Sequence, residues 1–90
     1  MSGAVLELEG DLRAGDAEAL RARLLGALAE GDVVLRTAGL TAVDTAVVQV
    51  LLSAQRTARQ LDRNLQIDAP QAGALGVMAA RLALGDALAA

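Results

Sequence analysis

The aliphatic run at residues 33–37, set between two stretches with helical periodicity, most constrains the fold of this chain. Its sequence, Val-Val-Leu-Arg-Thr, is typical of a buried strand, and Gly39 is expected to end it. Apolar and polar residues alternate in 4–9 and again in 65–68, which indicates two further strands. The chain is expected to turn at Gly10 and Asp11, directly after the first of these strands. The order strand, helix, strand, helix, strand, helix, with short connections, predicts a parallel sheet with right-handed crossovers.

The stretches between the strands indicate amphipathic helices. Asp16 is the predicted N-cap of the first helix. The second helix is expected from about Thr45 to Arg63, and a third helix is expected to begin at Pro70. The predicted core stripe of the second helix consists of Val47, Leu51, Ala54, Ala58 and Leu61.

The pattern within the strands separates the two faces of the sheet. One face would carry polar side chains, from Glu7, Glu9, Arg36, Gln66 and Asp68. The other face would be apolar, with Leu6, Leu8, Leu35, Leu65 and Ile67. We therefore predict a two-layer α/β fold, in which helices cover chiefly one face of a mainly parallel sheet of three to four strands. Residues 1–90 are expected to form a single domain.

Composition excludes most kinds of catalysis. The chain contains no histidine, cysteine, lysine or aromatic residue, so the usual metal ligands, nucleophile and base pairs, and Schiff-base amine are missing. A carboxylate-pair hydrolase would normally also need aromatic platforms for its substrate. We therefore predict a protein without enzymatic activity, catalytic residues, metal or cofactor.

Charge and hydropathy exclude other classes. The formal net charge is -3, and the eight basic residues, all arginine, are spread along the chain, which disfavours nucleic-acid binding. No apolar stretch is long enough to span a bilayer, and the amino terminus lacks the pattern of a secretion signal. We therefore expect a cytoplasmic protein that does not insert into membranes, and the absence of cysteine agrees with a reducing compartment.

Asp44 and Thr45 are the best candidates for a functional site. They follow the central strand at the mouth of the second helix, and ligands and partners usually meet open α/β sheets at the carboxyl ends of the strands. A purely structural role is also open, because Asp44 could cap the helix. The predicted partner-binding surface comprises Asp44, Thr45, Ala46, Val48, Gln49, Leu52 and Arg56. Arg56, Arg59 and Arg63 are most simply the solvated side of this helix.

Five short motifs follow one another along the chain: Gly-Asp-Leu at 10–12, Val-Val-Leu at 33–35, Gly-Leu at 39–40, Val-Asp-Thr at 43–45 and Leu-Leu at 51–52. Together these motifs resemble the STAS family, which includes bacterial anti-sigma-factor antagonists. In that family the hydroxyl residue directly after the aspartate is phosphorylated by a cognate kinase, and the resemblance places this role on Thr45. Many members continue with serine and glycine, whereas this chain has Ala46 and Val47.

The resemblance implies a regulatory protein-binding module. The Asp-Thr variant is similar to members that accompany chemotaxis kinases, to members of stress-signalling complexes, and to the small cytoplasmic subunit of phospholipid-transporting ABC systems. We predict a module that binds an anti-sigma or chemotaxis-type kinase or another ATPase through the amino end of the second helix, with phosphorylation of Thr45 as a candidate switch. The alternative is the subunit of the phospholipid-transport complex, where the partner is a transport ATPase. A small-ligand or nucleotide-binding domain is a third hypothesis, but no glycine-rich phosphate loop supports it.

The end of the chain carries three large apolar side chains with little polar cover, Leu82, Leu84 and Leu88. We expect this tail to dock on the core or to mediate a homodimer, because an exposed apolar patch favours association.

Overall fold

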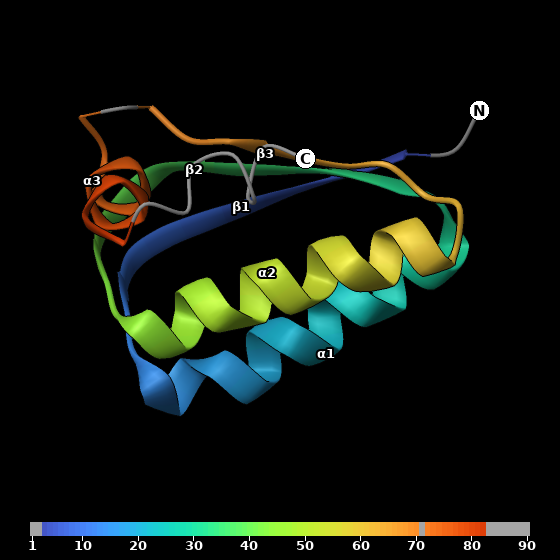
Figure 1. The fold of residues 1–90 in the computed structure, drawn as a ribbon, viewed down its shortest axis with the longest axis horizontal. Helices are drawn as coiled ribbons and strands as arrows, with labels where there is room; N and C mark the ends of the chain where they lie inside the picture. Colours follow the sequence, from blue (N-terminus) through green and yellow to red (C-terminus); the bar gives the residue numbers. More distant parts are fainter. Residues whose placement is uncertain (1–2, 71, 83–90) are drawn as a thin grey trace.

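The computed structural model describes residues 3–70 and 72–82. Its elements follow the predicted alternating order (Figure 1). They are β1 (Gly3–Leu12), α1 (Ala14–Glu30), β2 (Asp32–Val43), α2 (Thr45–Gln60), β3 (Leu65–Asp68) and α3 (Ala74–Arg81). The three strands form one sheet in the order β1-β2-β3, and both pairs of neighbours are parallel.

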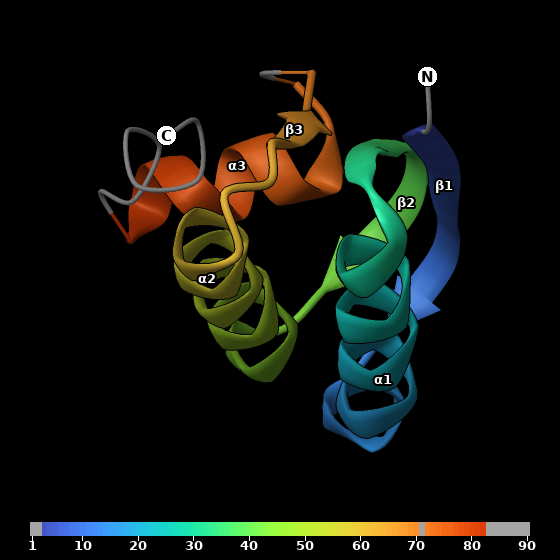
Figure 2. The ribbon, with the colours of Figure 1, turned by 90° about the vertical axis from the view of Figure 1, so that its right-hand side faces the viewer.

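The helices α1 and α2 lie side by side on one face of the sheet (Figures 1 and 2). The predicted two-layer, mainly parallel α/β architecture is therefore confirmed. Leucines and valines of the three helices and of the sheet form the core, and each such side chain contributes about 1.5–3 kcal/mol when fully buried. Those with no more than 1% of their surface exposed are Leu24, Leu28, Val33, Leu35, Val47, Val48, Leu51 and Leu75.

The first two strands are longer than predicted. β2 continues through Gly39 to Val43, and the expected turn at Gly10 lies inside β1. Gly39 pairs with Glu9, and a Cβ at this glycine would lie 3.3 Å from the carbonyl oxygen of Leu8. Gly39 therefore permits a close approach of β1 instead of ending the strand, and two register shifts in the β1–β2 pairing accommodate the irregularity.

Two buried polar side chains connect the ends of β3 to its surroundings. The Thr37 hydroxyl donates to the carbonyl oxygen of Asp68 at 2.9 Å. The Gln55 side-chain amide, on α2, donates to the carbonyl oxygen of Leu65 at 2.9 Å. Both interactions satisfy polar groups in the interior, where an unpaired group costs about 1–3 kcal/mol.

The second helix ends earlier than predicted. It stops at Gln60, and Leu61, assigned to the core stripe from the sequence, has 47% of its surface exposed. Asp62 has a positive φ of 57° and turns the chain. Arg63, predicted on the solvated side of the helix, lies beyond it, and its guanidinium Nε donates to the carbonyl oxygen of Leu28 at 3.1 Å.

The third helix begins at Ala74, after the N-cap Gly73, and not at Pro70. It packs against β2, and it buries Leu75 and Ala79. β3 pairs with β2 only as far as the Arg36–Asp68 pair. The strand ends there, and α3 is the next element of the chain. Of the predicted apolar tail, Leu82 has 37% of its surface exposed. Leu84 and Leu88 lie outside the described residues.

Candidate functional site

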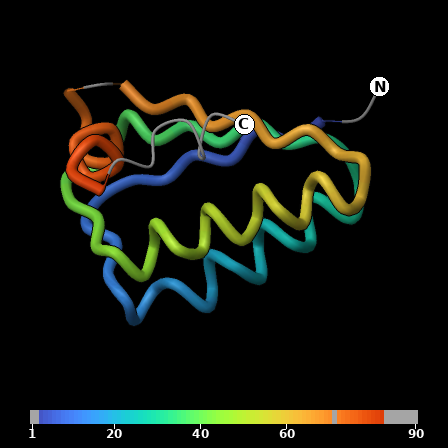
Figure 3. Tube along the Cα trace, in the orientation of Figure 1, coloured from blue at the N-terminus to red at the C-terminus, as the bar shows by residue number. Residues whose placement is uncertain are grey.

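The amino ends of α1 and α2 lie at the same edge of the molecule, where β1 and β2 end (Figure 3). This arrangement follows from topology, because each helix in a parallel βαβ unit begins at the carboxyl end of the preceding strand. Free amide groups of both first turns therefore point toward one edge. The Asp44 amide links the two connections, since it donates to the carbonyl oxygen of Leu12 at 3.3 Å.

Asp44 bonds to both helices. Its Oδ1 accepts from the Val47 amide of α2 at 3.3 Å, which makes it the N-cap of that helix. Its Oδ2 accepts from the Ala14 amide of α1 at 2.7 Å, across 30 positions of sequence. The carboxylate is half-buried, and its negative charge lies at the positive ends of two helix dipoles. The predicted capping role is therefore present, and it extends to a second helix.

A cluster of charged residues surrounds the start of α1. The helix begins after Arg13, so the predicted N-cap Asp16 is wrong by three positions. The Asp16 carboxylate instead accepts from the Arg13 amide at 2.9 Å, and the Asp16 amide donates back to the Arg13 carbonyl oxygen. The Arg13 guanidinium binds the Asp11 carboxylate, with Nη2 and Oδ2 3.2 Å apart. Asp11 raises the pKa of Arg13 by hydrogen bonding and by its charge, and the charge of Asp44 adds a smaller contribution.

Thr45 is the first residue of α2 and its side chain is exposed. Its hydroxyl makes no hydrogen bond with any residue between 3 and 82 that the structure describes. The contrast with Asp44 is therefore clear. The carboxylate is engaged within the fold, whereas the hydroxyl beside it faces outward from a helix whose position the carboxylate fixes.

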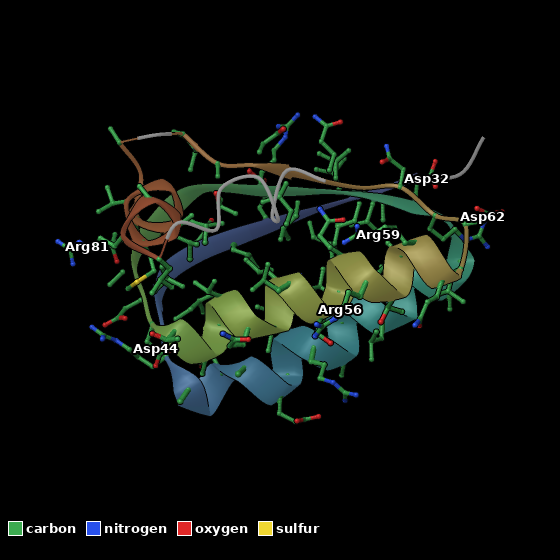
Figure 4. All side chains as sticks on the ribbon, in the orientation of Figure 1. Asp32, Asp44, Arg56, Arg59, Asp62 and Arg81 are labelled. Atoms are coloured by element: carbon green, nitrogen blue, oxygen red, sulfur yellow. The ribbon has the colours of Figure 1, made fainter. Side chains whose placement is uncertain are left out.

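The predicted partner surface is largely accessible, with one correction. Gln49 and Arg56 are exposed, and Ala46 and Leu52 are half-buried. Val48 has no exposed surface, so it cannot contact a partner. The sequence placed Val48 in a mixed patch with Thr45, Gln49 and Leu52, but α2 is buried over a face wide enough to cover Val47 and Val48 together. Figure 4 shows Asp44 at the amino end of α2, with Arg56 and Arg59 further along the helix.

Three contributors to this region were not predicted from the sequence. Ala14 meets Asp44 only after folding, and Arg13 binds Asp11, which is positioned by the extension of β1. The sequence did contain a local signal for the start of α1. Asp16 lies three residues after Arg13, which is the spacing of an N-cap and the acidic residue of a capping box. No local signal could have placed Ala14 beside Asp44.

None of the helices in the described part of the chain is long and apolar enough to cross a membrane. Among residues 3–70 and 72–82, no three of the metal-binding side chain types come together as a cation site. The arrangement at the α2 edge offers an exposed hydroxyl, a bound carboxylate and a mixed polar and apolar surface, which are features of a contact or modification site.

A family model described as "Mlab, STAS domain" matches residues 2–88. The chain belongs to the STAS family. STAS domains are generally regulatory modules without enzymatic activity, and they typically interact with protein partners. The sequence resemblance places the hydroxyl and acidic pair of this family on Thr45 and Asp44, and this assignment stays a prediction.

The STAS domain also resembles a solved structure titled "Crystal Structure Analysis of Mglu". The superposition has a TM-score of 0.66 at 23% sequence identity, and it covers 76% of this chain but 17% of that chain. At this identity the likeness supports the fold alone. No curated protein matches the chain.

Proposed function

We propose that this STAS domain is a non-enzymatic interaction module that binds a kinase-like or ATPase partner through the amino end of α2. The observation that carries the proposal is the division of roles between two adjacent residues. Asp44 is held by amides of both helices, whereas Thr45 is exposed and its hydroxyl has no partner among the described residues. A rigidly placed, free hydroxyl is suited to reversible contact.

Phosphorylation of Thr45 would act as a switch in this proposal. A phosphate at a helix amino terminus meets free amides and the positive end of the helix dipole, so the domain should tolerate it. A docked partner should not tolerate it, because a phosphate adds about two negative charges beside Asp44 in a desolvated contact. The partner would then be released without unfolding of the domain.

The alternative is a small subunit of a phospholipid-transporting ABC complex, in which the same surface contacts the nucleotide-binding subunit. The two residues after Thr45 support this alternative. Ala46 and Val47 replace the serine and glycine found in many phosphorylated members, and in transport subunits the threonine serves contact. Both functions use the same face of α2 and differ in the partner and in modification.

The test uses tagged full-length chain as bait, with Thr45→Ala, Thr45→Glu and Ala22→Glu. Ala22 is an exposed position on α1, so Ala22→Glu adds the same charge away from the proposed surface. We expect the parent and Ala22→Glu to retain the same partner and Thr45→Glu to lose it. Retention of that partner by Thr45→Glu would contradict the proposal.

The identity of the retained protein separates the two functions. A signalling kinase supports the leading function, and a transport ATPase supports the alternative. If a kinase is retained, incubation with ATP and mass spectrometry of the peptide that contains residue 45 shows whether this threonine is modified. Thr45→Ala provides the control for that measurement, because it removes the acceptor.

A further inference from the structure

The exposed face of α2 carries positive charge without any acidic residue. Between Thr45 and Gln60 the chain has two arginines, Arg56 and Arg59, and no aspartate or glutamate. Both arginines are exposed. Neither guanidinium forms a hydrogen bond or ion pair with any residue in the described ranges 3–70 and 72–82. Two cations on one helix are thus left uncompensated by the part of the fold that the structure describes.

These arginines share a face with the proposed contact residues. At 3.6 residues per turn, Thr45, Gln49, Leu52, Arg56 and Arg59 fall within an arc of about 80° on the helix surface. Figure 4 shows Arg56 and Arg59 on the carboxyl half of α2. The stripe from residue 45 to residue 59 is about 21 Å long at 1.5 Å per residue, and the half-buried Leu52 lies in its middle. We call these five residues the α2 stripe.

The neighbouring helix has a different charge pattern. α1 carries three acids, Asp16, Glu18 and Glu30, with two arginines, Arg21 and Arg23. Arg21 is paired with Glu18, with Nη1 and Oε1 3.4 Å apart. Intermixed charges of this kind are typical of a solvated helix face. The α2 stripe lacks that pattern, so solvation alone does not account for its composition.

The charge changes sign toward the amino end of the stripe. Three acids and one arginine, Asp11, Asp16, Asp44 and Arg13, lie near the start of the two helices. The surface is therefore negative near Thr45 and positive about three to four turns later. A partner that matches this gradient must place acidic groups over the carboxyl half of α2 and must not place them over the amino end.

We infer that the α2 stripe docks on an acidic protein surface, with aspartate or glutamate side chains of the partner opposite Arg56 and Arg59. The inference rests on the proposed function, because it extends the contact at Thr45 along the same helix. It also fixes the orientation of the partner, because only one orientation places acidic groups opposite the two arginines and keeps them away from the acidic residues near Thr45. Two arginines on a chain of net charge -3 favour carboxylates of a protein over the dense phosphates of a nucleic acid or a membrane.

The test measures binding of the full chain to the purified protein that the Thr45 experiment retains. The variant Arg56→Glu/Arg59→Glu is compared with Arg21→Glu/Arg23→Glu, which makes the same change in net charge on exposed positions of α1. We expect the α2 variant to bind about tenfold more weakly or worse, and the α1 variant to stay within about twofold of the parent. The difference should shrink at about 1 M salt, where the Debye length is about 3 Å.

A second measurement identifies the opposing group. The chain contains no lysine, so Arg59→Lys introduces a unique side-chain amine. Carbodiimide activation should join that amine to a partner carboxylate as an amide, which peptide mass spectrometry locates. Arg23→Lys is the matched control and should give no such product with the partner.

The outcomes separate this inference from the proposed function. Equal weakening by both double variants, or no weakening by either, overturns the inference. If Thr45→Glu loses the partner and Arg56→Glu/Arg59→Glu keeps it, the inference fails and the proposed function stands. If the reverse holds, the amino-terminal contact fails and the acidic partner stands. Arginine-dependent binding to phosphatidylglycerol vesicles, without an amide to a partner carboxylate, would assign the α2 stripe to lipid and overturn the inference. If the parent chain retains no protein, both the proposed function and this inference are refuted.

Discussion

The two ends of the helical layer are held by single side chains of opposite charge. At the amino end, the Asp44 carboxylate accepts from amides of α1 and α2. At the other end, the Arg63 guanidinium, which follows α2, donates to the carbonyl oxygens of Leu28 and Ala29 at the end of α1. An anion at helix amino ends and a cation at a carboxyl end both complement the helix dipole.

We call the Asp44 and Arg63 side chains ties, because each bonds to backbone groups of another helix. The two ties differ in their surroundings. Asp44 is half-buried and precedes an exposed hydroxyl, whereas Arg63 is exposed and follows the left-handed residue Asp62. Both ties fix the spacing of the helices, but only the amino end combines that spacing with a candidate contact residue. The carboxylate of Asp44 is thus engaged in holding the two helices together, whereas the hydroxyl of Thr45 beside it stays exposed.

The largest expected effect is from Asp44→Ala. This variant removes the N-cap of α2 and the acceptor of the Ala14 amide, so we expect a loss of about 2 kcal/mol in the free energy of unfolding. Chemical denaturation measures the loss. Asp44→Asn keeps one side-chain oxygen acceptor and should lose less. A loss below about 0.5 kcal/mol for Asp44→Ala would show that water replaces both bonds and that the tie has little value.

Arg63→Ala should have the next largest effect. The guanidinium bonds to carbonyls that have no partner in α1, so its removal should cost about 1 kcal/mol of unfolding free energy. Arg59→Ala is the matched control, because Arg59 is exposed and its guanidinium makes no hydrogen bond or ion pair with the described residues. Equal stability of the two variants would mean that the carboxyl-end tie contributes nothing.

An added negative charge should change the stability of the domain differently at the two ends of α2. Thr45→Glu places a carboxylate at the amino end and Gln60→Glu places one at the carboxyl end, and we expect each to change stability by less than about 1 kcal/mol. Gln60→Glu should be the more destabilising of the two, because its charge opposes the dipole. Thermal unfolding at low salt compares them. The opposite order would mean that repulsion by Asp44 outweighs the dipole.

The smallest expected effect is the coupling between the ties. The sites are separated by about the length of α2, roughly 24 Å for its 16 residues. We therefore expect the losses from Asp44→Ala and Arg63→Ala to add within about 0.5 kcal/mol in the double variant. A clearly larger deviation would show that the two helices move as one unit and that a partner bound near Thr45 can affect the far end.

Much of the fold was accessible from local patterns. Alternation in the strands and helical spacing of apolar residues predicted the element order and the single covered face. Interpretation of isolated glycines was wrong for Gly39 and Gly10, which both lie inside strands. Glycine weakens a strand but is also needed where another backbone comes close, and only the paired strand distinguishes these cases.

The candidate site, like the fold, could be predicted from the sequence only in part. The exposed Thr45 and the cap formed by Asp44 could be predicted, because both depend on residues within one turn of the helix. Val48 was assigned to the surface, yet it is fully buried, since the width of the buried face depends on how closely α2 packs on the sheet. Gln55, which was not singled out, is buried because a carbonyl of β3 lies within reach of its side chain.

The sequence by itself determined the three strands, the three helices and the acidic and hydroxyl pair at the start of α2. These features depend on interactions within a few residues, or on a periodicity that any apolar layer would select. Only the tertiary structure decided that Asp44 ties two helices and that Arg63 closes α1. Those bonds join groups 30 and 35 positions apart, and such groups meet only after burial of the core has brought the helices together.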